Sequence, residues 1–149
     1  MPITVHEIAE AELPQLLHLY THLHPDDNLL PLGDAAEIWQ SIERDPNQRF
    51  CGTYWNDALV SACTLIVIPN LTRGGRPYAL IENVVTHPDY RRQGCGTAVL
   101  KYALEGAWSR NCYKVMLLTG SQNEATLRFY ENAGFERGVK TGFVARPGG

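Results

Sequence analysis

Alternating and helical patterns of apolar residues divide the first third of the chain into three elements. Residues 3–8 alternate between apolar and polar side chains and predict a first strand. Residues 10–23 carry leucines at helical spacing and predict a helix. A loop broken by two prolines follows, and residues 34–44 then predict a second helix. The chain therefore opens with one strand and two helices.

The middle of the chain reads as consecutive strands. Residues 48–55 and 58–68 predict two strands joined by the turn-forming pair Asn56-Asp57. The second of them is almost wholly apolar at its end, which is typical of a central strand. A loop over residues 69–77 leads to a further apolar strand over residues 78–86. This part of the chain therefore predicts three consecutive strands.

A glycine-rich basic turn follows the strand that ends at residue 86. Pro88 stops regular pairing because it has no N–H to donate. Arg91 and Arg92 then precede Gly94 and Gly96, and residues 100–107 carry apolar side chains at helical spacing. Glycines let an oxyanion approach the backbone, and a helix N-terminus offers unpaired N–H groups with a positive dipole end. Strand, turn and helix together predict an anion-binding site.

The last part of the chain predicts a strand, a helix and a final strand. Residues 113–118 are apolar at successive positions and predict a strand covered on both faces. Ser121 and Glu124 have capping-box spacing, opening a helix that stops at Gly134, and residues 135–144 predict a last extended segment. The element order βααβββαβαβ indicates the α/β class, with a mixed sheet and helices on both faces.

Composition restricts the class of protein. A length of 149 residues fits one domain over residues 1–149, and the content of apolar (44%) and charged (19%) residues is that of a globular protein. A net charge of −3 disfavours nucleic acid as a partner. No apolar run approaches the roughly 20 residues of a membrane span, and the N-terminus lacks a signal-peptide pattern. With no C-x-x-C pair, we expect reduced thiols in a cytoplasmic protein at the scattered cysteines Cys51, Cys63, Cys95 and Cys112.

Two motifs in this order resemble those of the GNAT superfamily of acetyl-CoA-dependent N-acetyltransferases. The first is Arg91-x-x-Gly94-x-Gly96 after a strand, and the second is Tyr130-x-x-x-Gly134-Phe135 on a later helix. The bare first motif is also compatible with a simple β–α turn carrying solvated arginines. The resemblance implies a central, mostly antiparallel mixed sheet, with the strand at 78–86 splaying from the strand at 113–118. Residues 81–85 and 111–114 also look like those of glucosamine-phosphate N-acetyltransferases.

The same resemblance implies how acetyl-CoA is held as co-substrate. The turn would bind the pyrophosphate through its N–H groups, and the preceding strand would pair with the pantetheine arm. A backbone N–H near Val84 or Val85 would face the thioester oxygen. Cys95 would pack as a small apolar side chain and not act as a nucleophile. The cofactor-binding residues that the resemblance implies are Val84, Val85, Thr86, Arg91, Arg92, Gln93, Gly94, Cys95, Gly96, Thr97, Asn123 and Tyr130.

Two residues are candidates for proton transfer. A phenol has a pKa of about 10, so Tyr130 is protonated at neutral pH and could donate its proton to the departing thiolate. Its alternative role is a core aromatic on an amphipathic helix. Glu82 lies on an otherwise apolar strand and could accept the amine proton, directly or through water. The alternatives are that Glu82 is simply exposed or paired with a cation, and that a water chain serves as the base.

The function expected from these residues is direct acetyl transfer to a primary amine of a small metabolite, such as an amino sugar, an amino acid or a polyamine. The alternatives are a protein amine as acceptor and a non-catalytic acyl-CoA-binding sensor module. His18 and His22 stand i, i+4, but without a third ligand in a fixed frame we expect no metal site. Arg73 and Arg76 are either solvated or bind an anionic acceptor. We expect neither membrane nor nucleic acid as a partner, and a homodimer is compatible with the family.

Overall fold

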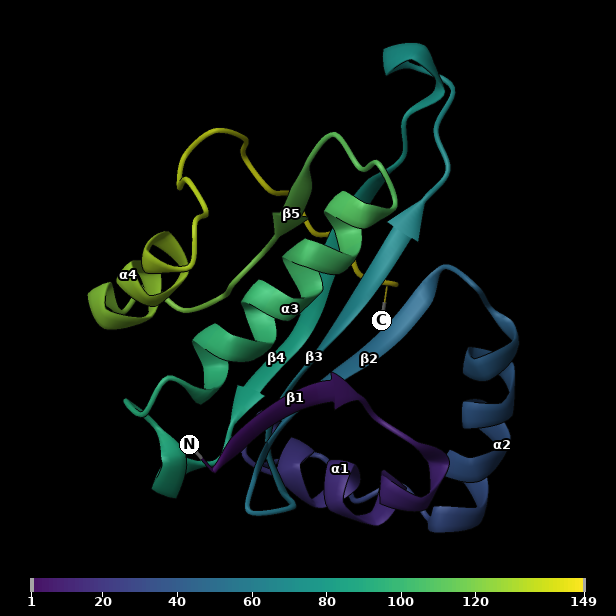
Figure 1. Cartoon of the computed structure of the whole chain (residues 1–149), viewed down its shortest axis with the longest axis vertical. Coiled ribbons are helices and arrows are strands. Elements are labelled where there is room, and N and C mark those ends of the chain that lie inside the picture. Colours follow the sequence, from purple (N-terminus) through teal and green to yellow (C-terminus); the bar gives the residue numbers. More distant parts are fainter. Residues whose placement is uncertain (1, 149) are drawn as a thin grey trace. The chain divides into compact units, whose positions relative to one another are not determined.

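The structure is a computed structural model that describes residues 2–148. These residues fall into two compact units, of which the first ends at Leu117 and the second begins at Leu118. The first unit contains the sheet and most helices, and the second contains one helix and the C-terminal segment (Figure 1).

A mixed sheet forms the centre of the first unit. Within residues 2–148 it has five strands that neighbour one another in sequence order. The pairs along the sheet are antiparallel except for the last one, which is parallel. This confirms the expected mostly antiparallel mixed sheet. The strands are β1 (Ile3–Glu7), β2 (Gln48–Trp55), β3 (Ala58–Ile68), β4 (Tyr78–Thr86) and β5 (Val115–Leu117).

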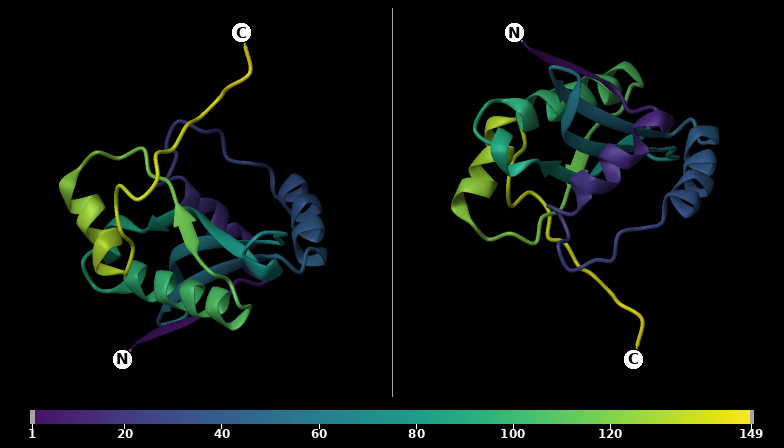
Figure 2. Two further views of the ribbon diagram at one scale, coloured as in Figure 1. Left: turned by 90° about the horizontal axis from the view of Figure 1, so that it is seen from above. Right: turned by 90° about the horizontal axis from the view of Figure 1, so that it is seen from below.

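Helices cover both faces of this sheet, as expected. One face is covered by α3, while α1 and α2 lie on the other (Figures 1 and 2). Short 3₁₀ turns precede α1, interrupt the β3–β4 connection and follow β4. The helical segments of the first unit are η1 (Glu10–Glu12), α1 (Leu13–Tyr20), α2 (Leu32–Arg44), η2 (Arg73–Gly75), η3 (Pro88–Tyr90) and α3 (Cys95–Ser109).

Alternation along the strands supplies a core to each face. Ala62 of β3 and Val85 of β4 are buried in a cluster with side chains of α1 and α2. The next residue along β3, Cys63, points to the opposite face, where its thiol lies 3.9 Å from the carbonyl of Val99 in α3. Leu100 of α3 is fully buried there. The two apolar faces therefore fix α1 and α3 on opposite sides of β3 and β4.

Three expectations about element bounds were wrong. The second helix begins at Leu32, two residues early, because Pro31 is extended and stands at its N-cap. The strand expected over residues 113–118 has only three residues, all half-buried, and Leu118 beyond it is 64% exposed. Apolar composition alone therefore overstated its burial. Residues 135–148 form no strand in the described chain, because glycines interrupt them and Gly138 turns at a φ of 77°.

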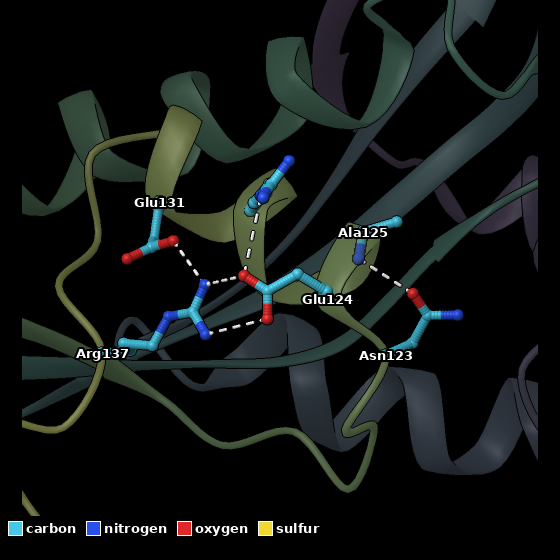
Figure 3. Close-up of polar contacts among 6 residues, drawn as sticks. Asn123, Glu124, Ala125, Glu131 and Arg137 are labelled. Atoms are coloured by element: carbon cyan, nitrogen blue, oxygen red, sulfur yellow. Dashed lines mark hydrogen bonds and ion pairs between the residues drawn. The ribbon is translucent and has the colours of Figure 1, made fainter.

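The second unit is built around α4 (Glu124–Asn132), which ends before Gly134 at a φ of 108° as expected. Its N-cap is Asn123 and not Ser121: the Asn123 side chain accepts a hydrogen bond of 2.8 Å from the N–H of Ala125 (Figure 3). Arg137 joins the two ends of the helix, because its guanidinium lies 2.8 Å from Glu124 and 2.7 Å from Glu131 (Figure 3). These two ion pairs hold the segment after α4 against the helix.

Candidate coenzyme-binding and active site

The second half of β4 has an edge that β5 does not occupy. Pairing between the two strands ends where Ile81 lies beside Leu117, whereas β4 continues to Thr86 (Figure 1). On its other edge, β4 is irregular opposite Cys63: the register with β3 shifts, and Asn83 has a φ of 51°. This is a β-bulge, which re-aims the backbone that follows it. The last residues of β4 therefore expose backbone groups that β5 leaves unpaired.

The register shows which backbone groups face this open edge. The N–H of His87 donates to the carbonyl of Val60 at 2.8 Å, so His87 faces β3. Because N–H groups alternate between the two edges of a strand, Val85 also faces β3. The backbone groups of Val84 and Thr86 then face the open edge. Of the residues expected to contact the pantetheine arm, Val84 and Thr86 have the backbone orientation for it, while Val85 contributes a buried side chain.

At the end of β4 the chain makes the glycine turn and enters α3. Gly94 is the N-cap of α3 with a φ of 84°, a left-handed conformation that glycine adopts without strain. Among residues 2–148, no side chain caps this helix, so the first N–H groups of Cys95, Gly96 and Thr97 have no intrahelical acceptor. A Cβ at Gly94 would meet nothing within 4 Å. A diphosphate fits this turn, because donors, helix dipole and free space coincide there.

Three contacts hold the turn against the sheet. The hydroxyl of Thr53 in β2 donates to the carbonyl of Cys95 at 2.8 Å, and both residues are buried. The N–H of Asp89 donates to Nδ1 of His87 at 3.1 Å, which closes the short turn after β4. Nε of Arg91 lies 3.4 Å from the carbonyl of Thr86. Hydrogen bonds within the protein therefore hold the turn and the start of α3 in place.

The polar side chains of the turn face solvent. Arg91, Arg92 and Gln93 are exposed, and Arg92 has a φ of 62°. Cys95 is buried, and burial raises the pKa of its thiol. A neutral, buried thiol agrees with the expected packing role and not with a nucleophile. The turn therefore presents two guanidinium groups and an amide beside the unpaired N–H groups.

Glu82 is exposed and lies on the face of the sheet that α1 covers. It stands opposite Thr64 of β3, and cross-strand partners share a face. Tyr20 at the end of α1 lies beside Thr64, and burial raises its pKa to about 12. Within residues 2–148, no cation pairs with the Glu82 carboxylate. Between an exposed Glu82 and one paired with a cation, the structure shows the exposed carboxylate, and its role as a base stays a prediction.

A group of histidines lies on the same face, past the end of β4. The rings of His22 and His87 are 4.6 Å apart, and those of His18 and His22 are 6.1 Å apart. Nε2 of His22 is shielded from solvent and has no hydrogen-bond partner in the described chain. Desolvation, with the nearby His87, His18 and Arg91, lowers the pKa of His22. Sequence spacing indicated the pair of His18 in α1 and His22 just after it, but gave no signal for the contact with His87.

Other candidates lie elsewhere. Asn123 and Tyr130 belong to the second unit, where Tyr130 packs against Phe129 at 5.0 Å and Phe135 at 6.3 Å between ring centroids. Arg73 lies in the β3–β4 connection, at the far end of the nine-residue strand β4 from the glycine turn. In the part of the chain that the structure describes, no group of three or more side chains is arranged to hold a metal ion. No helix there has the length and apolar character needed to cross a membrane.

A bulged strand with an open edge, followed by a glycine turn and an uncapped helix, combines an edge that an extended ligand can pair with and donors suited to an anion. Comparison with known protein families identifies the class of protein. The acetyltransferase (GNAT) family model matches residues 6–135, and the chain belongs to this family. The family is one of acetyltransferases, which is the class of enzyme expected from the sequence, and GNAT acetyltransferases use acetyl-CoA.

The chain is similar to several proteins of the family. The solved structure of an Agrobacterium tumefaciens protein assigned as an acetyltransferase matches with a TM-score of 0.92 and 41% identity, over 97% of this chain and 99% of that one. Glucosamine 6-phosphate N-acetyltransferase of Trypanosoma brucei brucei is 42% identical over 77 residues, 52% of this chain and 50% of that protein. The [ribosomal protein bS18]-alanine N-acetyltransferase of Escherichia coli (strain K12) is 33% identical over 132 residues, 89% of this chain and 80% of that protein.

The match to the Trypanosoma brucei brucei protein therefore spans about half of that protein's length.

Proposed function

We propose that this protein transfers the acetyl group of acetyl-CoA directly to a primary amine of a small metabolite, such as an amino sugar, an amino acid or a polyamine. The open edge of β4 beside the uncapped N-terminus of α3 is the observation that carries the proposal. The similarity to glucosamine 6-phosphate N-acetyltransferase supports a small amine as acceptor.

In this proposal the turn holds the coenzyme. The N–H groups of Cys95, Gly96 and Thr97 donate to the diphosphate, and Arg91 and Arg92 neutralise its charge. Gln93 adds an amide donor, and Gly94 leaves the space in which the oxygens lie. Val84 and Thr86 offer backbone groups to the pantetheine arm as an added strand would receive them. The coenzyme supplies an acetyl group activated as a thioester.

The chain's own residues then stabilise the developing negative charge and transfer protons. The N–H of Val84, which follows the bulge, donates to the negative charge that develops on the acetyl oxygen. Glu82, exposed on the α1 face, accepts the proton of the amine directly or through water. Tyr130 gives a proton to the departing thiolate, and Asn123 orders the start of the helix that carries it. The role of Tyr130 follows from its place in the family motif.

A protein amine is the second candidate acceptor. The relative that acts on an alanine of ribosomal protein bS18 aligns with 89% of this chain, a longer match than the amino-sugar relative gives. A peptide N-terminus has a pKa of about 8, so it needs less help in losing a proton than an amine of pKa about 10. The choice between the two acceptors is therefore open to a direct assay.

Release of free coenzyme A thiol, measured with a panel of amines, tests the proposal. The panel contains glucosamine 6-phosphate, single amino acids, a polyamine and a peptide that begins with alanine. Turnover with a small amine and none with the peptide is the expected result. Turnover with the peptide alone would move the assignment to the protein acceptor. Binding of acetyl-CoA without turnover on any amine would contradict the enzymatic proposal.

Replacing Tyr130 by Phe tests the proton donor. We expect turnover to fall by about one to two orders of magnitude with the affinity for acetyl-CoA nearly unchanged, because the ring stays and only the hydroxyl is lost. Tyr113→Phe is the matched control, since Tyr113 lies before β5 in the first unit. A Tyr130→Phe enzyme as active as the control would remove Tyr130 as the acid.

A further inference from the structure

Basic and aromatic side chains gather at the end of the sheet opposite the glycine turn. Arg73 comes from the β3–β4 connection, and Tyr113 and Lys114 come from the α3–β5 connection. The guanidinium carbon of Arg73 lies 5.6 Å from the ring centroid of Tyr113, and the ammonium of Lys114 lies 5.2 Å from the same centroid. Lys114 is also 5.4 Å from the ring of Tyr78. Two cations thus share one tyrosine ring.

Arg76 connects the two segments. Its Nε and Nη2 donate to the carbonyls of Asn111 and Cys112, each at 3.3 Å. The N–H of Tyr113 donates to the carbonyl of Pro77 at 2.9 Å. These bonds fix the β3–β4 connection against the segment before β5, so the cations are held in place and not merely attached to a loop. We call Arg73, Arg76 and Lys114, with Tyr78 and Tyr113, the basic patch.

No carboxylate neutralises the basic patch. Within residues 2–148, neither Arg73, Arg76 nor Lys114 takes part in an ion pair, although the protein has a net charge of −3. Like charges that share a ring repel each other, while each cation–π contact contributes only about 0.5–1 kcal/mol at an exposed site. An anion placed between the cations would relieve that repulsion. The patch is therefore built to receive negative charge.

The basic patch lies at the other end of β4 from the glycine turn, so it is separate from the site proposed for the diphosphate of the coenzyme. The strand β4 runs from Tyr78 to Thr86, and at about 3.3 Å per residue these ends lie roughly 26 Å apart. Figure 1 shows the β3–β4 connection and the start of α3 at opposite ends of the sheet. The proposed base Glu82 is nearer, four residues along β4 from Tyr78 or about 13 Å, so the anionic-acceptor role weighed for Arg73 and Arg76 stays a prediction. A ligand of the patch is therefore distinct from the coenzyme diphosphate at the glycine turn.

We propose that the basic patch docks an acidic polypeptide segment. Carboxylates fit the three cations, and Leu71 in the same β3–β4 connection as Arg73 is 99% exposed and free to contact an apolar side chain of the segment. Single-stranded nucleic acid is the weaker fit, because Arg73 and Lys114 already cover the ring of Tyr113 on which a base would stack. The partner is thus a protein with glutamates or aspartates around an apolar residue.

The test uses the full chain and a fluorescent peptide of glutamates with one central leucine. Anisotropy at low salt should report binding that weakens at physiological salt. The double variant Arg73→Gln/Lys114→Gln should bind about tenfold more weakly, since two exposed charge pairs are lost. The matched control Arg44→Gln/Lys101→Gln removes two exposed cations outside the patch and should change the affinity by less than about twofold. Thermal unfolding checks that each variant is folded.

Three binding results would overturn the proposal, and a fourth comes from a Tyr113 variant. The first three are no binding of the peptide at low salt, an equal loss in both double variants, and tighter binding of a short oligothymidine than of the peptide. Tyr113→Leu keeps every charge and removes the ring that orders them. The affinity for the peptide should fall by about threefold in this variant. Unchanged affinity in a folded Tyr113→Leu protein would also contradict the proposed arrangement.

Discussion

Replacing Gly94 separates two reasons for a glycine in the turn before α3. One is the left-handed backbone, and the other is the space that the diphosphate needs. Gly94 has a φ of 84°, and a Cβ there would meet nothing within 4 Å. The fold therefore resists Gly94→Ala only through the left-handed backbone, which costs an alanine about 1–2 kcal/mol. Gly94→Asn should cost less, because asparagine visits this conformation more readily. Urea unfolding should rank the free energies of unfolding as Gly, then Asn, then Ala.

Coenzyme A affinity should follow a different order. In the account above, the diphosphate lies where a side chain at position 94 would project, and any Cβ keeps its oxygens away from the N–H groups of Cys95, Gly96 and Thr97. Loss of one hydrogen bond to a charged group corresponds to about 1.5–3 kcal/mol, or roughly tenfold to a hundredfold in affinity. Both Gly94→Ala and Gly94→Asn should therefore bind coenzyme A at least about tenfold more weakly in calorimetry.

Gly33→Ala is the matched control, because Gly33 lies in α2, where an added Cβ also meets nothing within 4 Å. Gly33→Ala should raise the free energy of unfolding by up to about 1 kcal/mol and leave the affinity for coenzyme A unchanged. The reasoning is refuted if Gly94→Asn binds coenzyme A as tightly as the wild type. In that case the glycine would serve the backbone alone, and the anion would lie elsewhere.

Three further predictions concern the elements around the turn. Thr53→Val removes the hydroxyl that donates to Cys95 at 2.8 Å and should lower the free energy of unfolding by about 1–2 kcal/mol in urea; no change would show that the turn is held otherwise. Gly52→Ala should cost about 1–3 kcal/mol by the same measurement, because its Cβ would lie 2.6 Å from Leu59, and a neutral result would mean that Leu59 moves aside freely. The fold lowers the pKa of His22, so the unfolded chain binds its proton more readily, and stability should fall as the pH drops below about 6.5. Thermal unfolding of His22→Gln should show a shallower loss in acid, and an equal loss would exclude this ring as the cause.

Local patterns in the sequence were sufficient for most elements. Two strands over residues 48–55 and 58–68 were predicted on either side of the pair Asn56-Asp57. They correspond to β2 and β3, and this pair forms the turn with positive φ at both residues. The glycine turn was found for the same reason: strand, glycine and helix start are contiguous, so their spacing in the sequence is also their spacing in the fold.

Features that depend on register were not visible in the sequence. The bulge at Asn83 decides which backbone groups of β4 face the open edge, and it arises only when β4 is paired with β3. The contact of His22 with His87 joins the turn after α1 to the residue that follows β4, and the two are far apart in the sequence. Residues 135–144 were expected to be extended and form no strand among the described residues, because apolar side chains between glycines do not by themselves supply a pairing partner.

The central claim is that the start of α3 and the end of β4 bind the coenzyme. Amide chemical shifts, recorded during a titration with coenzyme A, test it most directly. The account predicts the largest changes at the N–H groups of Cys95, Gly96 and Thr97, with further changes at Val84 and Thr86. A titration that saturates while these five amides stay unmoved would contradict it.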